Sequence, residues 1–155
     1  MQRQVSLYDD LEGWFGMEET KHTYGNDQIR VEYYPDRCNH IGRCVRQLKD
    51  VFNPENRPWV DVDKADPDRI VDVVQSCPTG ALKVTRLDGG RGEEVPSLTE
   101  IQTVEGGPFW IRGHIQLKDE NGDIVSKETR VALCRCTKST NHPFCDGSHR
   151  NHNLH

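Results

Sequence analysis

The sequence predicts an α+β protein, in which a small module of mixed strands and helices is followed by a β-rich module. Three observations lead to this expectation. The six cysteines of the 155-residue chain fall into two groups of three, separated by a long gap. Between the groups lies a stretch rich in glycine and acidic residues, 88–97, whose composition is typical of a linker. After this stretch, apolar and polar residues alternate as they do in strands.

The first module is expected over residues 31–87, behind an N-terminal extension, 1–30, that shows no clear pattern. Asp66 is the predicted N-cap of its main helix, because Pro67 follows in the first turn, where its missing N–H costs nothing. An apolar stripe then points this helix toward the core. The predicted elements are a strand at 29–35, a helix at 42–49, a short strand at 59–62, a helix at 66–77 and a strand at 81–86.

The second module is expected over residues 98–155. Its first strand is predicted at 109–117, where the odd-numbered positions are apolar or glycine and are expected to share one face. Asp119-Glu-Asn-Gly122 is a hairpin turn signal, and the returning strand, 124–133, leads directly to Cys134. One hairpin leaves its apolar face without a cover, so we expect either a second copy of the chain or the first module to supply it.

Composition excludes several classes of protein. The hydrophobic fraction is 34 %, the mean hydropathy is −0.81, and no apolar run approaches the ~20 residues that span a bilayer. The first residues are polar rather than a signal core, and the net charge of −5 argues against general binding of nucleic acid. We therefore expect a cytoplasmic protein without membrane or nucleic-acid partners. Since no nucleophile–base set, phosphate loop or paired acid–base carboxylates stand out, we do not expect an enzyme.

The cysteines indicate metal or cluster sites rather than disulfides. Groups of three leave one thiol unpaired in each half, and a cytoplasmic environment is reducing. Three thiolates in each half, with a histidine near the second group, are instead typical of metal or cluster ligands. Modules this small have little core, and bound metals commonly stabilise such chains.

The strongest pattern lies at residues 134–149, where the sequence runs Cys134-Arg-Cys136-Thr-Lys-Ser-Thr-Asn-His-Pro-Phe-Cys145-Asp-Gly-Ser-His149. It resembles the CDGSH (mitoNEET-like) iron–sulfur motif at every specified position, and the resemblance extends upstream to Gly107-Pro-Phe109. The resemblance implies a [2Fe–2S] cluster held by Cys134, Cys136, Cys145 and His149, and a homodimer. Three cysteines and one histidine are also a structural zinc set, although zinc sites usually use C-x2-C or C-x4-C pairs.

A second pattern precedes the linker, in Cys38-Asn-His-Ile41-Gly-Arg-Cys44 and the remote Cys77-Pro78. Bacterial ferredoxins use C-x2-C-x2-C and a remote Cys-Pro. The stretch from Val31 to Leu82 resembles a divergent monocluster ferredoxin in which Ile41 replaces the middle cysteine. The resemblance implies a cluster held by Cys38, Cys44 and Cys77. Since isoleucine cannot bind iron, we expect a [3Fe–4S] cluster; the alternative is a [4Fe–4S] cluster whose fourth iron takes water, Asp36 or His40.

Two cluster modules in one chain predict an iron–sulfur protein that acts in one-electron transfer with a redox partner protein. Two other functions use the same ligands. The chain could store a cluster and deliver it to an apo-acceptor, with the histidine-ligated [2Fe–2S] cluster as cargo, or it could sense redox state.

Overall fold

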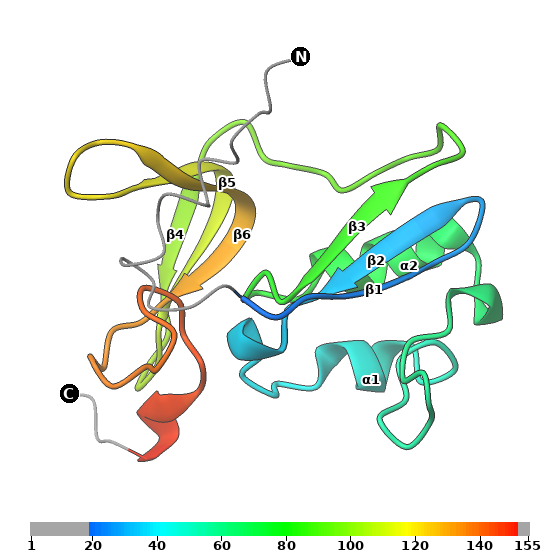
Figure 1. Cartoon of the computed structure of the whole chain (residues 1–155), viewed down its shortest axis with the longest axis horizontal. Helices are drawn as coiled ribbons and strands as arrows, with labels where there is room; N and C mark the ends of the chain where they lie inside the picture. Colours follow the sequence, from blue (N-terminus) through cyan, green and yellow to red (C-terminus); the bar gives the residue numbers. More distant parts are fainter. Residues whose placement is uncertain (1–18, 152–155) are drawn as a thin grey trace.

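The computed structural model describes residues 19–151. Two three-stranded antiparallel sheets lie side by side (Figure 1), so the expected α+β class is confirmed. Residues 1–18 of the expected extension and the last four residues of the second module lie outside the described range. The first sheet has the order β1 (His22–Gly25), β2 (Ile29–Tyr33) and β3 (Leu82–Arg86), and the second has the order β4 (Glu100–Thr103), β5 (Phe109–Lys118) and β6 (Ile124–Leu133).

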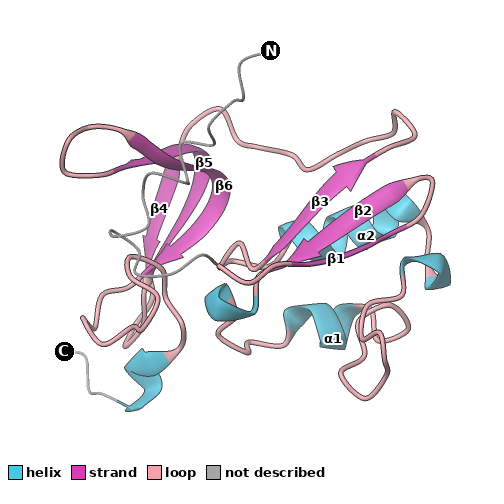
Figure 2. Ribbon diagram, in the orientation of Figure 1, coloured by secondary structure: helices cyan, strands magenta, loops and turns pink. Residues whose placement is uncertain are grey.

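All the longer helical structure belongs to the first sheet's half of the chain (Figure 2). Helix α2 (Pro67–Gln75) begins as expected, because the Asp66 carboxylate accepts a hydrogen bond from the Asp68 backbone N–H. Its apolar stripe is fully buried against the sheet and joins the core with Ile29 and Phe52. The buried stripe consists of Ile70, Val71, Val73 and Val74. Helix α1 (Arg43–Gln47) is shorter than predicted. Among the described residues, no helix is long and apolar enough to cross a membrane.

The short strand expected at 59–62 does not form. Val60 makes only an isolated bridge with Phe52, and a 3-10 turn, η3 (Val62–Lys64), follows at once. Asp61 causes this, because its side chain accepts a hydrogen bond from the Asp63 N–H and turns the chain. Strands β1 and β4 were not expected; both are short edge strands of mostly exposed residues, so neither shows an apolar alternation.

The hairpin β5–β6 forms as predicted, but its expected single apolar face is wrong. Arg112 pairs with Arg130 whereas Ile115 pairs with Glu128, so two residues of β5 oppose one residue of β6. Ile115 therefore shares a face with Glu128 rather than with Ile111. Gly113 carries the bulge at a φ of 147°, and a side chain there would lie 2.6 Å from the Thr99 hydroxyl oxygen.

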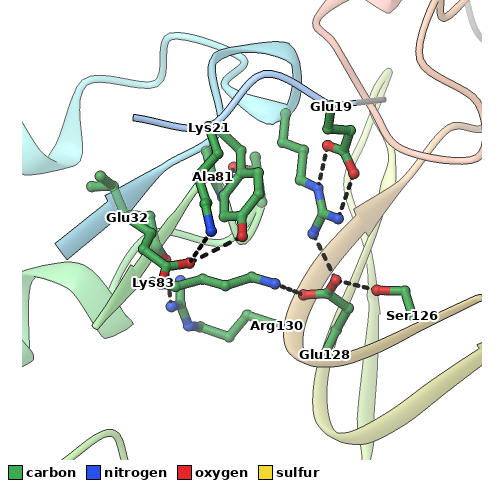
Figure 3. Close-up of polar contacts among 12 residues, drawn as sticks. Glu19, Lys21, Glu32, Ala81, Lys83, Ser126, Glu128 and Arg130 are labelled. Carbon is green, nitrogen blue, oxygen red and sulfur yellow. Dashed lines mark hydrogen bonds and ion pairs between the residues drawn. The ribbon is translucent and has the colours of Figure 1, made fainter. Parts of the chain in front are cut away.

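The first module covers the polar face of β6. Glu128 is 5 % exposed and Arg130 is 3 % exposed, and both contact residues from the first sheet's half of the chain. Figure 3 shows Glu128 between Lys83 and Ser126, with Arg130 beside them. Segment 88–97 runs between the modules without helix or strand, and is tied to both through ion pairs of Arg91 with Asp72 and of Glu93 with Arg130.

Candidate metal centres

Strand β6 delivers the first of the C-terminal cysteines, and the chain then loops back along the strand end. The Cys134 N–H donates to the Pro143 carbonyl at 2.7 Å, and the Cys145 N–H donates to the Ala132 carbonyl at 2.8 Å. These two bonds place Cys145 beside the end of β6, which Cys134 directly follows. Cys134 and Cys145 are thus brought together although they are eleven residues apart in the sequence.

The four C-terminal candidates lie in two pairs. The sulfurs of Cys134 and Cys136 are 3.7 Å apart, and the sulfur of Cys145 is 3.4 Å from Nδ1 of His149. The second pair depends on Gly147, whose φ of 90° turns the chain into the last 3-10 helix, η4 (Ser148–Asn151). The Asp146 carboxylate caps this turn by accepting a hydrogen bond from the Ser148 N–H. The sequence motif thus folds as its residue types predict.

The electrostatics of this loop suit a bound cation. Burial raises the pKa of the Cys145 thiol, and the neighbouring Cys134 and Cys136 thiolates raise it further. Burial also lowers the pKa of His149, and the positive charge of Arg150 acts in the same direction, which favours the neutral imidazole that binds metal. Three thiolates close together repel one another, and iron would remove that repulsion. The donor set therefore fits a cluster.

The three N-terminal cysteines come from three separate segments and line one pocket. Cys38 follows the 3-10 turn η2 (Pro35–Arg37), Cys44 lies in α1, and Cys77 follows the end of α2. The other lining residues are mostly apolar and include the isoleucine that replaces the ferredoxin cysteine. They are Tyr33, Asn39, Ile41, Gly42, Arg43, Trp59, Pro78, Thr79, Ala81 and Leu82.

Burial makes two of these thiols harder to ionise. Burial raises the pKa of Cys44 to about 11, and the nearby Cys77 adds to the shift. Burial also raises the pKa of Cys38, although hydrogen bonds from the His40 backbone and the Tyr33 side chain oppose it. An apolar pocket with three thiols fits a cluster whose irons would stabilise the thiolates.

The two proposed non-cysteine candidates lie at the edge of this site. His40 is exposed, with Nδ1 3.8 Å from the Cys38 sulfur, and its φ of 59° is unusual for a residue other than glycine. Asp36 is exposed, and its backbone carbonyl accepts a hydrogen bond from the Asn141 side chain at 3.3 Å. Within residues 19–151, no group of three or more His, Cys, Asp or Glu side chains is arranged to hold a single metal ion.

Comparison with known families shows what kind of domain holds each group of cysteines. Residues 24–87 match the family described as a divergent 4Fe-4S mono-cluster. The Escherichia coli protein YjdI, described as uncharacterized, is 38 % identical over 60 residues, which are 39 % of this chain and 79 % of YjdI. The chain belongs to the divergent 4Fe-4S mono-cluster family. All three N-terminal cysteines lie within the matched residues.

Behind this mono-cluster domain the chain carries a CDGSH domain. Residues 106–150 match the family described as iron-binding zinc finger CDGSH type. A CDGSH iron-sulfur domain-containing protein 2 homolog from Drosophila ananassae is 44 % identical over 43 residues, 28 % of this chain and 32 % of that protein. Its Drosophila mojavensis counterpart is 52 % identical over 31 residues, 20 % and 24 % of the two chains. No solved structure matches the chain. Both parts of the chain are therefore iron–sulfur binding domains.

Sequence reasoning missed two contacts, in each of which an arginine of one module touches the segment that carries candidate ligands in the other module. Arg130 of β6 donates to the carbonyl of Cys77 in the other module, and Arg37 stacks on Phe144, beside Cys145, with its guanidinium carbon 3.9 Å from the ring centroid. An arginine on the polar side of a strand, such as Arg130, or in a polar turn, such as Arg37, normally faces solvent. Only the pairing of the two modules shows that these two arginines are buried.

Proposed function

We propose that this chain binds two iron–sulfur clusters and passes single electrons between them. A one-electron donor protein would reduce one cluster, the electron would move to the other, and a one-electron acceptor would oxidise it. No atom is transferred, so no acid–base group is required. Two iron–sulfur binding domains in one chain support this function, since such clusters supply one-electron chemistry.

For the CDGSH domain we propose a [2Fe–2S] cluster. Each iron of such a cluster takes two protein ligands. The four candidates lie as two pairs, Cys134 with Cys136 and Cys145 with His149, which is the division that two irons require. A single zinc ion would instead need all four around one point.

For the mono-cluster domain we propose a [3Fe–4S] cluster on Cys38, Cys44 and Cys77, with a [4Fe–4S] cluster as the alternative. Ile41 lines the pocket at the position where ferredoxins place a ligand, and it offers no donor atom. The family description favours four irons. In that case His40 is the better fourth ligand, because its Nδ1 lies 3.8 Å from the Cys38 sulfur.

The observation that carries the proposed electron transfer is the contact between the two ligand loops. Asn39, which follows Cys38, packs on Gly147, which lies between Cys145 and His149; a methyl group added at Gly147 would lie 3.7 Å from the Asn39 Cα. The charge of Arg150 also acts on the Cys38 thiol. Because tunnelling rates fall steeply with distance, adjoining ligand loops favour transfer within one chain.

The test uses the anaerobically purified full chain. Iron and sulfide analysis should give about five irons per chain, or about six if the first cluster is a cubane. The protein is then mixed with one electron equivalent of reductant, and rapid-freeze EPR records which cluster is reduced at each time. The electron should redistribute between the two clusters until their reduced fractions reach the ratio set by their potentials. If the two clusters are reduced independently, with no exchange between them on the timescale of mixing, electron transfer within the chain is excluded.

One observation favours cluster delivery as a second function. All four CDGSH ligands lie within residues 134–149, and three of them are partly exposed, so an acceptor could reach this cluster without opening the core. Mixing the protein, with its iron and sulfide isotopically labelled, with an apo-ferredoxin would test cluster delivery. Delivery predicts that iron moves with sulfide into the acceptor; retention of the label excludes this function.

We also keep the homodimer as a proposal. The chain's own first module covers the polar face of β6, whereas Leu98 and Ile101 at the β4 edge are 78 % and 67 % exposed. A second copy could cover that edge. Sedimentation at several concentrations distinguishes a dimer from a 17.8 kDa monomer.

A further inference from the structure

Arg130 is a buried cation that belongs to neither proposed ligand set. Its side chain is 3 % exposed, although arginine normally reaches solvent. Glu93, from the segment between the modules, pairs with its guanidinium and balances the charge. Other N–H groups of this guanidinium bond backbone carbonyls of the mono-cluster domain. One bonds the carbonyl of Cys77, and another bonds the carbonyl of Leu82 at 2.7 Å.

These two carbonyls mark the ends of one loop, which runs from Cys77 to Leu82 in the mono-cluster domain. The loop lies directly on β6, because a methyl group at Gly80 would collide with the Arg130 carbonyl oxygen. Gly80 has a φ of 72°, so both its conformation and its surroundings require glycine. Inside the loop, the Thr79 hydroxyl lies 3.4 Å from the Cys77 sulfur and accepts a hydrogen bond from the Ala81 N–H.

We propose that Arg130 of the CDGSH domain is a positioning residue for the cluster of the mono-cluster domain. Its planar guanidinium bonds both ends of the loop that presents Cys77, and so fixes where that sulfur points. The inference rests on the proposed function only in taking Cys77 as a cluster ligand.

The chemistry of metal sites explains why this contact matters. Groups that hold a ligand from behind set its orientation, and their loss typically lowers metal affinity about 10–100-fold. Only arginine offers several donors in one rigid plane; lysine offers a single point charge. The unusual feature here is the origin of the support, since it comes from the neighbouring domain and from a strand that ends at that domain's own ligand, Cys134.

Because Arg130 belongs to one domain and contacts the ligand loop of the other, its replacement has a specific expected effect. A residue of β6 that serves only its own domain would, when changed, disturb the CDGSH cluster. If Arg130 positions Cys77, its replacement should instead loosen the cluster of the other domain. The experiment follows the loss of each cluster from the full-length, cluster-loaded protein in excess chelator. EPR distinguishes the two clusters and records the line shape of the mono-cluster signal.

The variants are Arg130→Gln, Arg130→Lys and a control, Lys83→Met. Lys83 also bridges the domains, through Glu128 at 2.8 Å, but contacts no proposed ligand. We expect Arg130→Gln to lose the mono-cluster iron at least about tenfold faster, the lower end of the range for loss of a group that orients a metal ligand, and to change the EPR line shape of that cluster. Arg130→Lys should lose the mono-cluster iron at a rate between those of the parent protein and Arg130→Gln. Lys83→Met should match the parent protein in both respects, and the CDGSH cluster should be lost at its original rate in all three.

Two results would overturn the proposal. The first is an equal increase in the rates at which both clusters are lost from Arg130→Lys, which would show that Arg130 only docks the domains. The second is a change of the mono-cluster signal in Lys83→Met as large as the change in Arg130→Gln, which would show the same. If Arg130→Gln does not fold, the lysine variant decides alone. No donor or acceptor takes part in this measurement, so a failure of electron transfer leaves it intact. Absence of iron from the first domain in the parent protein would instead refute the proposed function.

Discussion

The two candidate centres differ in how their ligands are distributed along the chain. The proposed mono-cluster ligands come from three segments, with Cys77 far from Cys38 and Cys44 in sequence. They line a pocket that adjoins the buried apolar core of the described part of this domain. The proposed CDGSH ligands all come from residues 134–149, which follow one strand. The same kind of cofactor would therefore cross-link a whole domain in the first case and one loop in the second.

This difference teaches that a metal's effect on stability depends on what its ligands connect. A cross-link between remote segments restricts most of the unfolded chain, whereas one within a short loop leaves the rest free to fold or unfold locally. Four predictions test this contrast and the joint between the two domains.

The largest effect is expected from removal of one ligand in each domain. Cys77→Ser should lower the free energy of unfolding by about 4 kcal/mol, the scale of a cross-link that closes a loop of this length. Cys136→Ser should cost the whole chain less, because its loop can loosen while β5 and β6 remain paired. Denaturant unfolding of both cluster-loaded variants measures this. Equal losses would show that the distribution of ligands is irrelevant.

The next effect concerns Glu128 at the joint between the domains. Burial alone would raise its pKa, but Arg37 and Lys83, with a hydrogen bond from Ser126, outweigh burial and lower it. A carboxyl group with a lowered folded-state pKa stabilises the protein above its unfolded value, about 4.3, and this stability is lost as pH falls through the folded value. Glu128→Gln should cost about 2 kcal/mol at neutral pH, since Arg37 and Lys83 each lose a charged partner while Glu19 still pairs with Arg37.

Urea unfolding at a series of pH values measures this second prediction. The parent protein should lose stability in acid below about pH 4.3, and the glutamine variant should lose less over the same range. The same acid slope in both proteins would mean that Glu128 is not the titrating group.

A smaller effect should appear in the potential of the CDGSH cluster. The substitution His149→Cys replaces a neutral imidazole by a thiolate and so adds a negative charge. It should lower the midpoint potential of the CDGSH cluster by at least about 100 mV. The mono-cluster potential should stay unchanged. His142→Ala is the control, since His142 is on the same loop but bonds the Thr137 carbonyl. A shift that also appears in this control would contradict the assignment of His149.

The smallest effect separates packing from backbone strain at the joint. Gly80 and Gly89 have φ angles of 72° and 77°, so an alanine at either position carries similar strain. Gly80→Ala would in addition collide with the Arg130 carbonyl, whereas Gly89→Ala meets nothing within 4 Å. We expect Gly80→Ala to cost about 1–2 kcal/mol more, the range for overpacking. Equal unfolding free energies for the two variants would show that the domains are not closely packed there.

The sequence predicted what depends on local patterns. The cap at Asp66, the buried stripe of α2 and the hairpin that leads to Cys134 each follow from residues close together in the chain. The bulge at Gly113 escaped prediction because a residue without a side chain interrupts no alternation. Strands β1 and β4 escaped because exposed edge strands show no apolar period.

The contacts between the domains could not be predicted for a different reason. Arg37, Glu128 and Arg130 each look like solvated charges when only their own element is considered. Their burial follows from the placement of β6 against the first domain, and no spacing along the chain encodes that placement.

The contact of β6 with the first domain also has a consequence for how the molecule folds. If the domains separated, Arg37, Glu128 and Arg130 would lose partners that now compensate buried charges. Neither half could then open without a cost to the other. The chain should accordingly unfold in a single cooperative transition, detected alike by the tryptophan at position 59 in one domain and by the tryptophan at position 110 in the other.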